Sequence, residues 1–294
     1  CALAMNVAYA ADWKPDRIIE LVVPTGPGSG VDNTARTLQM IMQTSKLVDA
    51  PMSVTNRAGG VSAPPYDTRN LAAHVGDDIT SVRSNRAQLE SELGLGMLTW
   101  MGPVHGVALD IVDDATALVP NVDALATTRT RRPLVTLGAD CVPLVMTAGD
   151  FAIAAHIGWR GFVDGMTSTI LGLLAAHGVA ASEAQIVLGP AICGRCYGIP
   201  EERADAIRAV SANAVGIARH GGPGADIRIG LTEQWEAVGA RVTTIGPCTA
   251  EDHSSFSHRR DGEHEDRREQ TEDRTRSADA WGVHRIEPIR RGTS

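Results

Sequence analysis

Aromatic residues are scarce in this chain of 294 residues, with three Phe, three Tyr and five Trp. A hydrophobic core must therefore be filled mainly by Leu, Val, Ile and Ala, which a hydrophobic share of 43% allows. Lysine is nearly absent, occurring only as Lys14 and Lys46, and the net charge is −8. This acidic balance argues against nonspecific binding to a nucleic-acid backbone, so we expect no nucleic-acid partner.

Long apolar runs and a paired set of cysteines are also missing. No apolar run reaches the roughly 20 residues that a membrane-spanning helix needs, so we predict no membrane span. The five cysteines are odd in number and scattered, which excludes a disulfide framework. The length allows one large domain or two small ones.

One Cys and two His are candidates for a metal centre. Cys141 follows the apolar run 133–139, and His156 follows the run 151–155. Both runs are typical of short buried strands, so two adjacent strand ends can present Cys141 and His156 side by side. Together with His105 upstream, they form a donor set that zinc uses when one position stays open for chemistry. On spacing alone, Cys141 as a small buried apolar residue and His156 as a core histidine fit equally well.

Beyond these residues, a series of short motifs resembles the laccase-domain family, also called the YfiH-like or multicopper polyphenol oxidase family. The resemblance covers about 55–262, in the family's order. The matching segments are 56–62 (NRAGGVS), 70–71 (NL), 74–78 (HVGDD), 85–86 (NR), 104–106 (VHG), 139–141 (ADC), 156–161 (HIGWRG), 189–190 (GP), 193–197 (CGRCY), 248–249 (CT) and 256–262 (FSHRRDG). Within them, Ile157 and His258 stand where the family usually has Ala and Tyr.

The resemblance implies an α/β fold, a layered α/β/β/α sandwich of mixed sheets flanked by helices. It also implies a zinc-dependent purine nucleoside phosphorylase that cleaves adenosine, inosine, guanosine or methylthioadenosine with phosphate, giving free base and ribose 1-phosphate. On this hypothesis, zinc (or, alternatively, copper) is held by His105, Cys141 and His156. Arg57 and Arg160 are candidates for holding phosphate, because the guanidinium fork suits that anion. Asp140 is either a partner of the metal ligands or a general acid or base.

Other functions remain open at the same residues. Adenosine deaminase activity suits an activated water, although the H-x-E and P-C-x-x-C signature is absent. A copper polyphenol oxidase suits one Cys and two His, although the His-rich motifs of a multicopper cluster are missing. A Cys–His hydrolase would use Cys141 as nucleophile, with His105 or His156 as base. The non-enzymatic alternative is an inactive chimera or a fragment of a solute-binding protein.

The segment Cys193-Gly194-Arg195-Cys196 has the spacing of a redox or zinc CxxC motif. No second CxxC accompanies it, so the sequence offers no complete structural zinc site of the usual kind. In the resembled family this stretch is structural and lies near the pocket. We therefore expect no metal there.

The two ends of the chain depart from the family pattern. Residues 1–10 end in an A-x-A sequence and are typical of a signal-peptide remnant. Residues 11–52 predict a strand at 18–23, a glycine-rich loop at 24–30 and a helix at 34–42, and resemble the start of a tripartite tricarboxylate transporter (Bug) solute-binding protein. The laccase-like domain is assigned to 53–262. Residues 263–294 mix charges of both signs and predict a disordered tail.

The compartment follows from these assignments. A laccase-like domain acting on nucleosides and phosphate favours the cytoplasm, and a signal-peptide remnant favours export. We give the domain more weight and expect a cytoplasmic enzyme of unknown oligomeric state.

Overall fold

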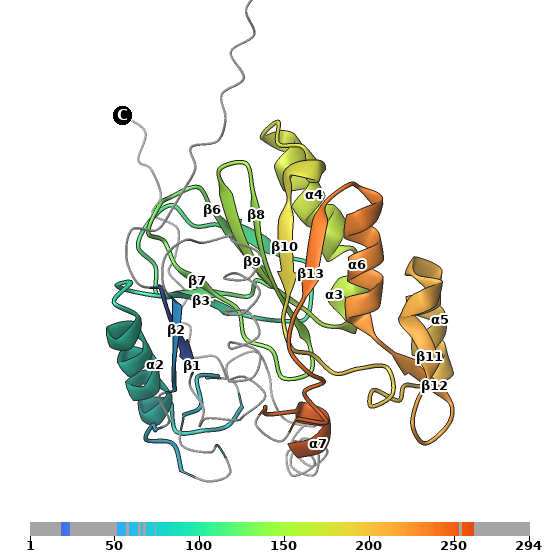
Figure 1. Cartoon of the computed structure of the whole chain (residues 1–294), viewed down its shortest axis with the longest axis horizontal. Helices are drawn as coiled ribbons and strands as arrows, with labels where there is room; N and C mark the ends of the chain where they lie inside the picture. The colour runs from blue at the N-terminus through green and yellow to red at the C-terminus, as the bar shows by residue number, and fades with distance from the viewer. Residues whose placement is uncertain are drawn as a thin grey trace, which may run out of the picture.

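The computed structural model describes residues 19–23, 52–56, 59–63, 66, 69–73, 75–252 and 255–261 (Figure 1). For 19–23 and 52–56 it describes the backbone alone. Several predictions lie outside the described residues: the signal-peptide remnant, the loop at 24–30, the helix at 34–42, Arg57 and the tail at 263–294. The predicted first strand is confirmed as β1 (Ile19–Val23), which pairs in parallel with β2 (Met52–Asn56).

A mixed six-stranded sheet forms the centre of the fold. Its strands, in spatial order, are β13 (Arg241–Thr244), β10 (Gln185–Leu188), β8 (Val142–Ala148), β9 (Phe151–Ile157), β6 (Ala124–Thr127) and β4 (Leu109–Ile111). The two outer pairs are parallel and the inner pairs antiparallel. A smaller parallel sheet contains β5 (Leu118–Pro120), β3 (Thr99–Gly102) and β7 (Leu134–Val135). The short strands β11 (Val215–Ile217) and β12 (Pro223–Ala225) form an antiparallel pair.

Helices cover both sides of these sheets. In Figure 1, α3 (Trp159–Val163), α4 (Met166–Ala176), α5 (Glu201–Val210) and α6 (Ile227–Ala237) lie on one side of the six-stranded sheet. The helix α2 (Ile79–Leu93) lies on the opposite side of the molecule, beyond β3 and β7. The short α7 (His258–Asp261) ends the described chain. This arrangement confirms the predicted α/β fold of mixed sheets flanked by helices.

The main core lies between the six-stranded sheet and its helices. Buried residues four apart give α4 one apolar face, and α6 shows the same spacing. The strands present every second residue to these helices, so Ala155 and Ile157 of β9 belong to this core. The helix residues with this spacing are Met166, Ile170 and Leu174 in α4, and Ile227, Leu231 and Trp235 in α6.

A second core lies between the two sheets. Met101 and Val119 of the small sheet meet Leu125 of β6 and Ala154 of β9 there. Because side chains alternate along a strand, His156 shares the face of Ala154. The side chain of His156 is thus directed into the layer between the sheets, toward the loop that follows β3.

One predicted strand differs from the structure. The predicted strand at 133–139 shortens to Leu134–Val135, and Cys141 precedes β8 instead of ending a strand. The reason is a tight turn, in which a Cβ on Gly138 would lie 2.5 Å from the Cys141 carbonyl oxygen. The helices α3 and α4 are separated at Gly165, whose φ of 94° lies in the left-handed region. The helix α5 ends at Val210, because Ser211 is extended at φ −150°.

Candidate metal centre and active site

The structure brings together the three predicted metal donors. The ligand atoms of His105, Cys141 and His156 lie within 4.8 Å of one another. Cys141 directly precedes β8, and His156 lies near the end of the antiparallel β9, with Pro143 opposite His156. His105 comes from the loop after β3, with a left-handed φ of 60°. The sheet pairing therefore aligns two donors, and a strained loop adds the third.

Asp123 connects two of the three backbone segments that carry the donors, the His105 loop and the strand with His156. It is fully buried at the start of β6. One carboxylate oxygen accepts the backbone N–H of His105 (2.9 Å) and contacts His156 Nδ1 (3.1 Å). The other accepts the N–H of Gly106 (2.8 Å). Asp123 thus holds the His105 loop in place and leaves Nε2 of His156 as the free donor atom, as carboxylates behind metal-binding histidines do.

The electrostatics of the centre favour a deprotonated thiol. Burial acts to raise the pKa of Cys141, but hydrogen bonds with His105 and His156 outweigh it and lower the pKa to about 7. Burial acts to lower the pKa of His156, but hydrogen bonds with Asp123 and Cys141 outweigh it and raise the pKa to about 9. Burial acts to raise the pKa of Asp123, while bonds from His156 and Gly106 hold it below its usual range. These shifts favour the thiolate form of Cys141 beside a protonated His156, and a divalent cation that binds both donors can replace that proton.

Exposure increases across the three donors. His156 is 5% exposed, Cys141 is half-buried and His105 is exposed. The rings of His105 and His156 stand edge to face, with centroids 4.9 Å apart. A metal held by these donors would have its open position on the solvent side, where substrate can reach it.

Gly158 borders this centre directly. A Cβ at this position would lie 3.1 Å from Cys141 Sγ and 3.3 Å from His105 Cδ2. The backbone φ of −83° is open to any residue, so glycine is required here by space alone. Gly158, two residues after His156, therefore keeps room for the donors.

We expect Gly158→Ala to weaken metal binding and activity at the centre about tenfold or more, because the methyl group displaces Cys141 or His105. The matched control is Gly172→Ala in α4, where a Cβ meets nothing within 4 Å. Metal content and turnover of the two variants are compared at equal folded protein. Equal metal retention in both variants would contradict the steric argument.

The donor set fits a catalytic zinc site. One thiolate and two imidazoles leave a fourth tetrahedral position free, and a buried carboxylate orients one imidazole. The same donors suit copper, so the residues form a candidate metal centre that does not select between the two ions.

Arginines surround two aromatic rings beside the centre. The guanidinium carbons of Arg160 and Arg203 lie 4.8 Å and 4.5 Å from the ring centroid of Trp159. Arg203 also donates to the hydroxyl of Tyr197 (3.3 Å). Burial and the nearby Cys141 charge raise the pKa of Tyr197, with Arg203 acting in the opposite direction. The predicted phosphate residue Arg160 thus belongs to a basic and aromatic cluster that also contains Trp159, Tyr197 and Arg203.

A further arginine reaches this cluster from α7. The guanidinium carbon of Arg259 lies 5.2 Å from the ring centroid of Tyr197, and its Nη1 donates to the carbonyl of Gly198 (3.3 Å). The cluster therefore has three guanidinium groups from separate helices. We call Arg160, Arg203 and Arg259 the arginine cluster.

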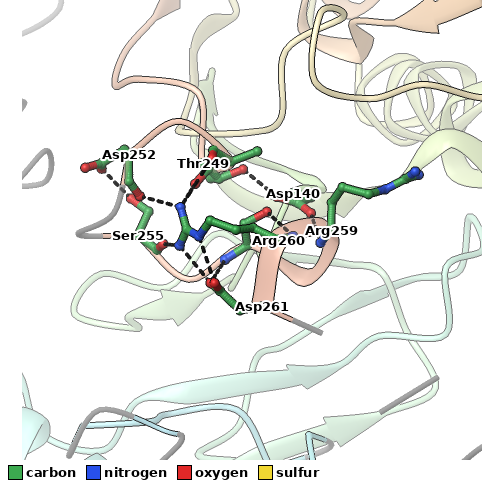
Figure 2. Close-up of polar contacts among 9 residues, drawn as sticks. Asp140, Thr249, Asp252, Ser255, Arg259, Arg260 and Asp261 are labelled. Carbon is green, nitrogen blue, oxygen red and sulfur yellow. Dashed lines mark hydrogen bonds and ion pairs between the residues drawn. The ribbon is translucent and has the colours of Figure 1, made fainter. Parts of the chain in front are cut away.

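Asp140 is held on both sides, as Figure 2 shows. Its Oδ1 accepts the hydroxyl of Thr249 (2.6 Å), and its Oδ2 accepts the backbone N–H of Arg259 (2.7 Å). Its φ of 84° lies in the left-handed region. Asp140 thus fixes the backbone beside Cys141 and the start of α7. These contacts involve none of the three metal donors, so both predicted roles of Asp140 stay predictions.

The neighbouring Arg260 closes the loop before α7. In Figure 2 its guanidinium points into that loop, whereas the Arg259 side chain extends away from it. Arg260 donates to the carbonyls of Thr249 (3.0 Å) and Asp252 (3.0 Å), and it pairs with the carboxylate of Asp261 (2.7 Å). The loop is thereby fixed next to the residues that contact Asp140.

A sequence model of a known family matches most of the chain. The family is described as "Multi-copper polyphenol oxidoreductase laccase", and it matches residues 51–268. The chain belongs to this laccase-like family.

Members of the family with related sequences carry a different activity in their names. A protein of Mycobacterium tuberculosis named purine nucleoside phosphorylase is 40% identical over 214 residues, covering 70% of this chain and 85% of the relative. One of Streptomyces coelicolor with the same name is 37% identical over 229 residues, covering 76% and 95%.

Solved structures share the fold. YlmD from Geobacillus stearothermophilus has a TM-score of 0.63 at 30% identity, covering 69% of this chain and 84% of that one. The protein YfiH of Bacillus licheniformis has a TM-score of 0.65 at 25% identity, covering 69% and 85%. The laccase-like family resemblance expected from the motifs is confirmed.

Sequence reasoning missed Asp123 and Arg203. Asp123 stands directly before an apolar strand, and an acidic residue entering a buried strand is a usable signal for a functional carboxylate. Arg203 lies among the charged residues of a surface helix, and nothing in the sequence separates it from Arg208.

Within the described residues, no helix is long and apolar enough to cross a bilayer.

Proposed function

We propose that this laccase-like protein is a zinc-dependent purine nucleoside phosphorylase, which converts adenosine, inosine or guanosine and phosphate into free base and ribose 1-phosphate. The observation that carries the proposal is the position of α3, which carries Trp159 and Arg160 and begins directly after Gly158, the residue that borders Cys141 and His105. Arg203 lies over the same Trp159 ring. An oxyanion site beside a metal centre suits phosphate as a second substrate. The names of the related mycobacterial and Streptomyces proteins agree with this function.

The arginine cluster would hold the phosphate nucleophile. Guanidinium groups pair with phosphate oxygens through charged hydrogen bonds, and positioning a second reactant removes much of the entropy of a two-substrate reaction. A phosphate oxygen bonds to C1′ as the C1′–N9 bond breaks, and the purine accepts a proton. Asp140 serves this step indirectly, by fixing the backbone N–H of Arg259.

The metal centre would act on the same substrates. Bound zinc would supply Lewis acidity, which polarises an oxygen ligand. Asp123 holds His156 in the orientation that this ligand set needs, and Gly158 keeps the space open. His105, the exposed donor, lies where nucleoside would enter.

We expect Arg160→Gln to raise the KM for phosphate about 10- to 100-fold, because one charged hydrogen bond to an anion is lost. Arg203→Gln should act in the same direction. The matched control is Arg208→Gln on the same helix as Arg203, because Arg208 pairs with Glu201 and Asp205 at the surface. Steady-state kinetics at varied phosphate measure the effect. An unchanged KM for phosphate in both variants would mean that the arginine cluster does not bind phosphate.

The function itself is tested by measuring free base released from adenosine and inosine, with and without phosphate, on protein of known metal content. Phosphorolysis predicts base release that needs phosphate and yields ribose 1-phosphate. Ammonia release from adenosine would instead indicate the deaminase alternative, and oxidation of a phenol with copper bound would indicate the polyphenol oxidase alternative. A folded protein without metal or turnover would indicate the inactive chimera.

A Cys–His hydrolase is the second candidate, because Cys141, His156 and Asp123 form a thiolate, imidazolium and carboxylate in series. A hydrolase triad needs one histidine, whereas His105 and His156 both flank the thiol. The second histidine therefore favours the metal centre. Hydrolase activity that survives complete metal removal would reverse this choice.

A cytoplasmic location accords with the supply of nucleosides and phosphate there.

A further inference from the structure

A second group of metal-donor side chains lies apart from the proposed active centre. The ligand atoms of Cys193, Cys196, Cys248 and Glu251 all lie within 4.8 Å of one another. The three cysteines are free thiols. The thiol of Cys196 faces the carboxylate of Glu251 at 3.5 Å. The second CxxC that the sequence lacks is thus replaced in space by a Cys and a Glu from another turn.

Two turns of the same construction supply these donors. In the first, the backbone N–H groups of Cys196 and Tyr197 donate to the Cys193 carbonyl (3.0 and 2.9 Å). In the second, the N–H groups of Glu251 and Asp252 donate to the Cys248 carbonyl (3.1 and 2.9 Å). Each turn therefore brings its first and fourth residues together, as the paired ligands of structural zinc sites require.

Backbone contacts hold the two turns face to face. Cys248 forms a parallel bridge with Ala191, and the N–H of Thr249 donates to the Ala191 carbonyl (3.2 Å). The N–H of Cys193 donates to Cys248 Sγ at 3.3 Å. A backbone N–H directed at sulfur stabilises the thiolate form, which is the form that binds metal. Backbone pairing between the two turns therefore sets the positions of the four donor residues before any metal binds.

We propose that Cys193, Cys196, Cys248 and Glu251 bind a structural zinc ion separate from the centre at Cys141. Three thiolates and one carboxylate fill all four positions of tetrahedral zinc, which leaves none open for chemistry. Sulfur ligands around such an ion stand roughly 3.8 Å apart, given zinc–sulfur bonds of about 2.3 Å, so small side-chain shifts suffice. The guanidinium of Arg219 bonds to Glu251 and offsets part of the negative charge.

A disulfide accounts for these residues less well. It would consume two of the three thiols and leave the third thiol and Glu251 without a role. Zinc uses all four donors. The ion would join the turn at 248–251 to the turn at 193–196. Both adjoin Asp140, through the Thr249 hydroxyl and the N–H of Ile192 (3.1 Å).

The test is metal analysis of the full-length chain and of variants that separate the two sites. The variants are Cys196→Ser and Glu251→Gln for the second site, and Cys141→Ser for the first. The controls are Cys1→Ser, which lies outside the described residues, and Glu236→Gln, an exposed residue of α6. Circular dichroism establishes that each variant is folded.

We expect about two zinc ions per wild-type chain, about one in Cys196→Ser and in Cys141→Ser, and none in the double variant. Glu251→Gln should lose its second zinc to a chelator at a concentration that leaves both ions in Glu236→Gln. Cobalt bound to the Cys141→Ser protein should show thiolate charge-transfer absorption. This absorption should be absent from the double variant, which also carries Cys196→Ser.

Two results would overturn the second site. One is a wild-type protein whose only zinc is lost in Cys141→Ser. The other is a disulfide among the three cysteines in freshly purified protein, with no zinc uptake after reduction. The result does not depend on nucleoside turnover, so an inactive protein with two zinc ions would refute the proposed function and leave the second site standing.

Discussion

Cys141→Ala should abolish the metal centre and reduce phosphorolysis by at least about 1000-fold. The thiolate is the one anionic donor among the three ligands, and two neutral imidazoles bind zinc far more weakly. Loss of a Lewis acid removes several kcal/mol of transition-state stabilisation, and each 1.36 kcal/mol is about tenfold in rate. Base release from inosine and zinc content measure the two effects together.

The matched control for this change is Val145→Ala. Val145 lies on the same strand, β8, and is 46% exposed, so its truncation should leave both metal and rate near the wild-type values. A Cys141→Ala protein that is folded, free of zinc at the centre and still fully active would exclude a catalytic metal. It would also exclude the Cys–His hydrolase, which needs the same thiol.

Asp123→Asn should cost both stability and metal affinity. Each oxygen of the fully buried carboxylate accepts a hydrogen bond from a backbone N–H group. In Asn, an NH2 group replaces one of these oxygens and would face a backbone N–H, so two donors would oppose each other. His156 also loses its charged partner. We expect unfolding free energy to fall by about 3 kcal/mol, as for other broken buried pairs, and zinc affinity to fall about 10- to 100-fold.

Denaturant unfolding and chelator competition measure these losses. The control is Asp113→Asn, because Asp113 pairs with Arg129 at the surface, where such pairs contribute at most about 1 kcal/mol. A stability equal to that of the control would mean that the hydrogen bonds to Asp123 are dispensable. Loss of stability with unchanged zinc affinity would limit Asp123 to a structural role.

Local pattern predicted the strand β1 and the buried strand β9, because each follows from an apolar run in the sequence. The motifs also identified the metal donors that the structure brings together. The pairing of β8 with β10 was not predictable, since β9 and the helices α3 and α4 separate these two strands along the chain. The turn at Gly138 shows the limit of periodicity, because a close approach of backbone atoms ended the predicted strand early.

The site residues that were not predicted owe their roles to contacts between segments that are distant in sequence. Asp123 matters because the loop carrying His105 folds back onto it, 18 residues away in sequence. Arg203 acquires a role from its position over Trp159, a residue of another helix. Glu251 became a donor candidate when the turn at Cys248 came to face Cys193. Residue type alone carries none of these relations.

The antiparallel pairing of β8 with β9 has a consequence for how the active centre assembles. Cys141 and His156 flank a single hairpin, so forming that hairpin in register places two of the three donors before any distant segment arrives. Shifting the pairing by two residues would move Cys141 along β9 by about 7 Å relative to His156, at roughly 3.4 Å per residue. Metal captured during folding would thus select the correct hairpin register, and His105 would complete the set once the smaller sheet docks.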